Sequence, residues 1–107
     1  MEPLLVLTNL PDAASAETLA YALIDSRAAA CVNVLQPCRS IYRWQGRLET
    51  AEEVPLLIKT SVANYPLVEQ IVRAQHPYDV PELIALPITQ GLPAYFAWLA
   101  TETERHE

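Results

Sequence analysis

The hydrophobic period of this chain switches repeatedly between strand and helix spacing within 107 residues. Apolar runs at 4–7, 31–35, 53–60 and 82–88 are typical of strands, whereas 15–29 and 64–75 repeat with helical spacing. A last helix follows Pro93, and the polar tail from Thr101 to Glu107 is expected to fray. The order β-α-β-β-α-β with an added C-terminal helix predicts a single α+β domain over residues 1–107. The expected fold is a ferredoxin-like sandwich with two helices on one face of an antiparallel sheet.

Residues 38–60 are expected to form a long hairpin. Gln45-Gly46 resembles a two-residue turn in which glycine supplies the positive φ. Folding about this turn places Tyr42 opposite Glu49. Pro37 interrupts the strand that begins at residue 31, and Pro55 cannot donate to a ladder, so it is expected at an edge or a bulge.

Composition limits the classes of partner and the location. The net charge of −6 disfavours nucleic acid and anionic membranes, since both attract basic surfaces. No apolar run approaches the roughly 20 residues that span a bilayer, and the N-terminus reads as a first strand rather than a signal peptide. A cytoplasmic protein is therefore expected. Apolar residues make up 51% of the chain, a surplus that predicts burial between subunits.

Four segments, taken together, carry a family resemblance. They are Ala29–Asn33, the S-x-Y-x-W-x-G hairpin 40–46, the return strand with Glu49, Glu53 and Lys59-Thr60, and His76-Pro77-Tyr78-Asp79-Val80-Pro81-Glu82. In this order and spacing they resemble the CutA family, the divalent-cation tolerance proteins. The resemblance implies a homotrimer of ferredoxin-like subunits, akin to the PII-type signalling trimers. It also implies a binding or signalling role in tolerance of divalent metals, chiefly copper, rather than an enzyme.

The resemblance makes His76 the candidate metal ligand. Some family members join it to a cysteine at the end of the first strand and to a preceding histidine, but here these positions hold Thr8 and Gln75. One imidazole without a thiolate partner binds copper weakly, so weakly bound copper is the one cofactor expected. The alternative is that His76 only ends a helix, where a partly charged imidazole is favourable.

The predicted ligand site collects aromatic and charged residues from the hairpin and the His-Pro-Tyr segment. Its members are Tyr42, Trp44, Glu49, Glu53, Lys59, Tyr78 and Glu82. In a cleft between subunits, Lys59 can anchor a small anionic ligand or act as the counter-ion of buried carboxylates. Tyr42 and Trp44 share one strand face, where they either stack on a ligand or pack against another subunit.

Two other classes share this topology. A small enzyme acting on an anionic metabolite at the inter-subunit cleft is the alternative function, but the loop 8–14 has neither the arginine nor the glycine of an anion cradle. An RNA-recognition module needs basic and aromatic strands that this chain lacks. Cys31 is expected to be a buried hydrophobe and Cys38 the more exposed thiol, with no role assigned to it.

Overall fold

The computed structural model describes residues 1–105 and shows a mixed α+β fold. Its elements in chain order are β1 (Pro3–Leu10), α1 (Ala13–Asp25), β2 (Cys31–Val34), β3 (Cys38–Trp44), β4 (Arg47–Ser61), α2 (Tyr65–Gln75), β5 (Leu83–Pro87) and α3 (Pro93–Glu102). The predicted helix and strand segments are present in the predicted order, but the stretch 31–44, expected as one strand interrupted at Pro37, forms two separate strands, β2 and β3.

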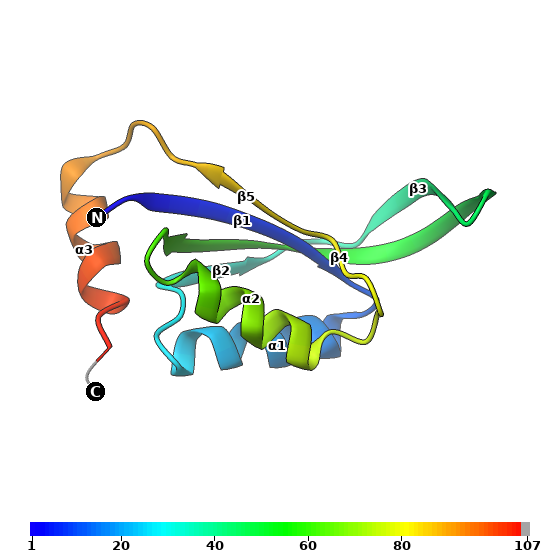
Figure 1. The fold of residues 1–107 in the computed structure, drawn as a ribbon, viewed down its shortest axis with the longest axis horizontal. Helices are drawn as coiled ribbons and strands as arrows, with labels where there is room; N and C mark the ends of the chain where they lie inside the picture. Colours follow the sequence, from blue (N-terminus) through cyan, green and yellow to red (C-terminus); the bar gives the residue numbers. More distant parts are fainter. Residues whose placement is uncertain (106–107) are drawn as a thin grey trace.

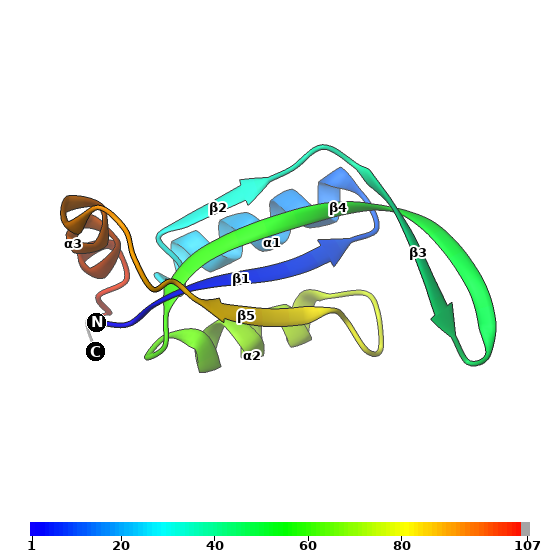
Figure 2. The same cartoon turned by 90° about the horizontal axis from the view of Figure 1, so that it is seen from above.

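The sheet is antiparallel, with the strand order β2-β4-β1-β5, and β3 pairs with the far half of β4. Helices α1 and α2 both lie against one face of this sheet, and α3 stands at its end beside the N-terminus (Figure 1). Seen from above, the opposite face carries no helix (Figure 2). One layer of helices on one layer of sheet thus leaves the second sheet face uncovered in the single chain.

The core lies between the sheet and its two helices. Alternate residues of β1 and β4 point into it because successive side chains of a strand lie on opposite faces. The fully buried members are Val6, Leu10, Leu56 and Ile58 from the sheet, Leu19 and Leu23 from α1, and Val68 and Val72 from α2. The helical residues recur at three- or four-residue spacing, which gives each helix a single apolar stripe.

Helix α1 begins and ends earlier than the predicted range 15–29. Asp12 caps its N-terminus, with the carboxylate accepting the Ser15 backbone N–H at 2.7 Å. The chain leaves the helix at Ser26, and Arg27 adopts a left-handed conformation with φ of 61°. The predicted extension of this helix to residue 29 was therefore wrong, since the helical spacing of apolar residues continues into a turn.

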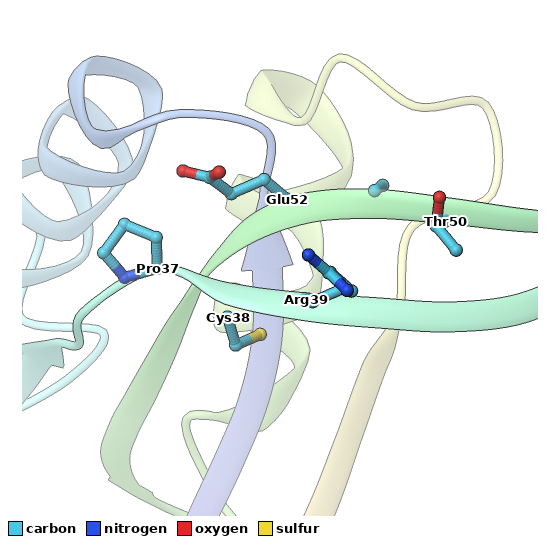
Figure 3. Close-up of a pocket in the computed structure, with 6 residues that line it drawn as sticks. Pro37, Cys38, Arg39, Thr50 and Glu52 are labelled. Atoms are coloured by element: carbon cyan, nitrogen blue, oxygen red, sulfur yellow. The ribbon is translucent and has the colours of Figure 1, made fainter.

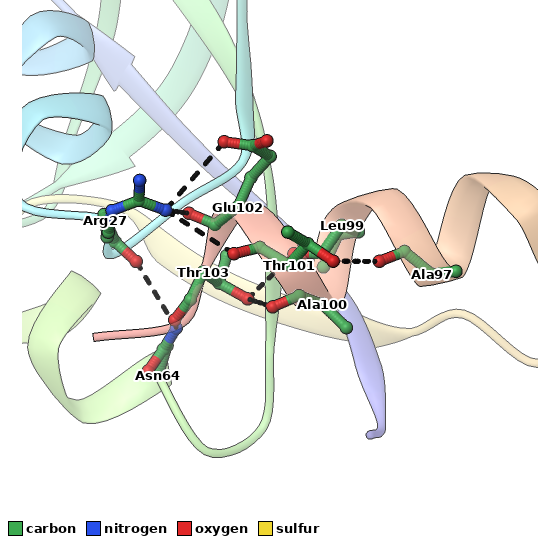
Figure 4. Close-up of polar contacts among 8 residues, drawn as sticks. All are labelled: Arg27, Asn64, Ala97, Leu99, Ala100, Thr101, Glu102 and Thr103. Carbon is green, nitrogen blue, oxygen red and sulfur yellow. Dashed lines mark hydrogen bonds and ion pairs between the residues drawn. The ribbon is translucent and has the colours of Figure 1, made fainter. Parts of the chain in front are cut away.

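The C-terminal segment is tied to the body by side chains from two loops (Figure 4). Arg27 Nη1 donates to the carbonyls of Thr101 at 3.5 Å and Glu102 at 3.2 Å. Asn64 stands at the start of α2, and its side-chain amide donates to the carbonyl of Thr103 at 2.9 Å instead of capping the helix. The expected fraying from Thr101 is therefore wrong for residues 101–103, and residues 106–107 lie outside the described part.

The β3–β4 hairpin extends beyond the main sheet (Figure 2). Its turn has positive φ at Gln45 and Gly46, and Tyr42 lies opposite Glu49, as predicted. Between the last pair of β2 and the first pair of β3, residues 35–37 lie opposite residues 54–55. This unequal count is a bulge, and Pro55 lies in it, as expected for a residue that lacks an N–H.

Candidate functional site

The uncovered face of the sheet is apolar across three adjacent strands, β4, β1 and β5. Registered partners share a face, and this patch consists of Leu5 and Leu7 of β1, Leu57 of β4, and Ile84 and Leu86 of β5. Ile84 and Leu86 are exposed and the other three are half-buried. We call these five residues the open-face patch. A contiguous apolar surface of this kind is typical of a protein–protein contact.

A hollow of about 790 Å³ lies where the hairpin meets the segment that follows α2. Its lining residues are Asn9, Ser40, Ile41, Tyr42, Trp44, Glu53, Tyr78, Asp79, Val80, Pro81 and Glu82. We call this space the hairpin hollow. It gathers five of the predicted ligand residues, namely Tyr42, Trp44, Glu53, Tyr78 and Glu82.

The single chain does not bring Lys59 to this hollow. Glu53 and Lys59 lie on the same strand, but six residues of extended chain separate them by roughly 20 Å. Lys59 instead lies beside the open-face patch, paired in register with Leu5 and Cys31. Within residues 1–105 it forms no ion pair. Glu49 lies further out on the hairpin, opposite Tyr42, so a meeting of Lys59 with the carboxylates requires another subunit.

Negative groups dominate the hairpin hollow. Glu53 is only 8% exposed, and Asp79 and Glu82 also line the space. The Asn9 amide donates to Glu82 Oε1 at 3.4 Å. None of the described lining residues is basic. Asp79 and Asn9 were missed by the sequence analysis, although Asp79 stands inside the His-Pro-Tyr segment and was a readable signal.

Tyr78 reports on this environment through its phenol. Burial first, and then the negative charge of Glu53, raise the pKa of Tyr78 above its ordinary value of 10.0. Both effects disfavour the phenolate, so the hydroxyl keeps its proton at neutral pH. Tyr78 therefore presents a hydrogen-bond donor beside the buried carboxylate.

Ultraviolet difference titration of the native protein against Tyr78→Phe is expected to show a phenol that ionises above pH 10.0. Glu53→Gln should lower the raised pKa of Tyr78 part of the way back, because it removes the charge but not the burial.

The folded state holds the Tyr78 phenol proton more tightly than the unfolded chain does. Its contribution to stability is thus present below pH 10 and lost as the pH rises through the folded value. Glu52→Gln, on the other face of the strand, should leave the pKa of Tyr78 unchanged. A Tyr78 phenol that ionises at its ordinary pH would contradict the assigned effect of burial and of Glu53.

His76 uses both ring nitrogens within the chain. Its Nδ1 accepts the Tyr78 backbone N–H at 3.1 Å, so the ring proton is assigned to Nε2, which donates to the Asn9 carbonyl at 2.6 Å. The side chain is 8% exposed and ends α2 in an extended conformation. His76 thus joins the end of β1 to the start of the hollow-lining segment.

Thr8, which stands where some family members have a cysteine ligand, does not complete a metal site. Thr8 is buried, and its hydroxyl is the buried side-chain atom without a hydrogen-bond partner in the described part of the chain. Over residues 1–105, no three histidine, cysteine or acidic side chains gather closely enough to hold a metal ion. The role of His76 as a copper ligand stays a prediction.

A smaller hollow of about 330 Å³ opens at the bend between the sheet and the hairpin (Figure 3). It is lined by Pro37, Cys38, Arg39, Thr50, Ala51 and Glu52. The Cys38 thiol is free and exposed, and Cys31 is free and half-buried. The greater exposure of Cys38 agrees with its prediction, whereas Cys31 is less buried than expected.

Comparison with known proteins decides the family. A family model described as CutA1 divalent ion tolerance protein matches residues 4–102. The chain belongs to the CutA1 family. The Divalent-cation tolerance protein CutA of Thermus thermophilus is 45% identical over 92% of this chain and 95% of its own length. The crystal structure of CutA1 from Oryza sativa superposes with a TM-score of 0.95 at 36% identity, covering 99% of this chain and 97% of that one.

The CutA1 family name is that of a divalent-cation tolerance protein and not of an enzyme. A CutA structure from Archaeoglobus fulgidus has a TM-score of 0.92 at 31% identity over 95% of this chain and 99% of its own, and is described as periplasmic. The cytoplasmic location predicted here thus stays a prediction. None of the helices in the described part of this CutA1 chain is long and apolar enough to cross a membrane.

Proposed function

We propose that the chain acts in divalent-cation tolerance as a cytoplasmic homotrimer, a binding and signalling module of the PII type with ligand clefts at its subunit borders. The observation that carries this proposal is the open-face patch, an apolar sheet face that no helix covers. Obligate interfaces are large and hydrophobic, and they resemble the cut half of a domain core. A second layer packed on this patch completes the sandwich from another copy of the chain.

The hairpin supports the same proposal. It projects beyond its own sheet and carries exposed apolar side chains, Ile41, Tyr42, Trp44 and Leu48. A two-stranded hairpin is at best marginally stable alone in water. Docking of this hairpin on a neighbouring subunit buries these side chains and places the hairpin hollow at a subunit border.

Light scattering on the purified protein should give a mass of about three times the 11.9 kDa of one chain. The expected trimer should persist at micromolar concentration, because an interface of this apolar character releases subunits slowly. Native mass spectrometry on protein prepared without chelator checks the subunit count and any retained ligand together. A monomer at micromolar concentration would contradict the proposal.

Copper is expected to bind weakly through His76. Its two nitrogens already form hydrogen bonds, and Thr8 and Gln75 supply no thiolate or imidazole beside it. An enzyme acting on an anionic metabolite gains no support from the hairpin hollow, since none of its described lining residues is basic. The small anionic ligand expected from the sequence stays a prediction. The negative charge of the lining favours a cationic ligand instead.

A further inference from the structure

The hairpin hollow combines three aromatic side chains with three carboxylates. Tyr42, Trp44 and Tyr78 line it together with Glu53, Asp79 and Glu82. Its volume of about 790 Å³ lies in the range of small-molecule sites, roughly 300–1,000 Å³. A carboxylate attracts positive charge, and the face of an aromatic ring attracts it too.

Glu53 is the most buried of the three carboxylates in the lining. Its side chain is more than nine-tenths buried, and no basic side chain in the described part of the chain pairs with it. Burying an unpaired charge is costly, and a cation of opposite sign offsets the cost. The Tyr78 phenol beside it can donate a hydrogen bond but brings no positive charge.

The size of the hairpin hollow and the spacing of its ligands indicate which class of cation it can hold. A bare metal ion needs several ligands within about 2–2.6 Å, and over residues 1–105 no such cluster forms. A space of this size, with aromatic walls and only a few carboxylates, suits a larger and softer cation. An ammonium group with alkyl substituents satisfies both kinds of lining residue.

We propose that the hairpin hollow binds a small organic cation, an alkyl or quaternary ammonium group, held by the buried Glu53 and the rings of Tyr42, Trp44 and Tyr78. This inference rests on the proposed ligand cleft and names the class of its ligand. The ammonium group has two possible sources: a free amine, or the lysine side chain of a second copy of this chain. Lys59 is the only lysine in the sequence, so the second source can be removed with one substitution.

Calorimetry with choline and with butylamine tests the proposal, and 3,3-dimethylbutan-1-ol serves as the uncharged analogue of choline. Indole N–H signals in NMR give a second readout, since Trp44 lines the hollow whereas Trp98 lies on α3. Glu53→Gln is expected to weaken binding of the cations by about tenfold or more. Glu52→Gln is the matched control, a neighbouring carboxylate outside the hollow, and should change affinity by less than about twofold.

Each outcome of these binding experiments either supports or overturns the inference. Saturable binding of a cation, Glu53-dependent and absent for the uncharged analogue, supports a free amine as ligand. Binding that appears only in Lys59→Met supports the same ammonium site filled by a second copy. Equal binding of the uncharged analogue, or no binding of either cation in any variant, overturns the inference. One chain supplies the lining described here, so failure of this inference and failure of the assembly can be told apart. A trimer without binding overturns only this inference, and a monomer that binds overturns only the assembly.

Discussion

Ile84→Glu is expected to convert the proposed trimer into monomers. Ile84 lies on β5, the edge strand of the open-face patch, and pairs in register with Leu7 of β1. A glutamate there buries an unpaired charge in every subunit of the assembly, which costs several kilocalories per mole for each. The same residue is 52% exposed in the single chain, so the fold of the monomer should change in stability by less than about 0.5 kcal/mol.

Light scattering across a dilution series measures this effect, with circular dichroism as the check that the fold persists. Tyr21→Glu is the matched control, because Tyr21 is an apolar side chain of α1 that is 70% exposed on the helical layer. It should leave the trimer intact. If Ile84→Glu stays trimeric at micromolar concentration, the open-face patch is not the interface and the proposed assembly is wrong in its main contact.

His76→Ala is expected to lower the free energy of unfolding by about 2–4 kcal/mol, since it removes two hydrogen bonds and a buried ring. The Asn9 carbonyl and the Tyr78 N–H lose their partners together. The end of β1 then separates from the segment that lines the hairpin hollow. Urea denaturation at one fixed protomer concentration measures the loss, because the stability of an oligomer depends on concentration.

Metal removal distinguishes a structural role of His76 from a role as a metal ligand. A structural role predicts the same loss in His76→Ala with and without chelator, because both hydrogen bonds lie within the chain. If chelator destabilises the native protein as much as the substitution does, and leaves the variant unchanged, His76 acts as a metal ligand. Gln75→Ala is the matched control: Gln75 is an exposed neighbour on α2, and its loss should stay within about 0.5 kcal/mol.

The hairpin was predictable in detail because its signals are local. A Gln-Gly turn fixes the register of an antiparallel pair, so the pairing of Tyr42 with Glu49 followed from counting residues. The early end of α1 was not predictable in this way. Its apolar spacing continues into residues 28–30. Ala28 and Ala29 are buried in the core, but they reach it through the turn at Arg27 and not as part of the helix. Periodicity alone does not distinguish these causes.

Part of the predicted residue set meets in the hairpin hollow, but its charge differs from the expectation. Residues 78–82 and the hairpin aromatics line one space, as the family resemblance implied, and their binding of a ligand stays a prediction. Glu53 and Lys59 are six residues apart on β4, and an even separation puts both side chains on one strand face. Two side chains on the same strand face need not be close, however. Six residues of extended strand place Lys59 far from the hairpin hollow. Without Lys59, the local charge of the site is negative rather than mixed.

The bulge at residues 35–37 also bears on the order of folding. It separates the backbone ladder of β2 from that of β3, so closing the main sheet does not by itself align the hairpin. The hairpin has few apolar neighbours of its own chain, and such segments open with little free energy. Amide protons of β3 should therefore exchange faster in a monomeric variant than those of β1. Their protection in the native protein should appear in a concentration-dependent phase, when subunits meet, rather than in the first collapse of the chain.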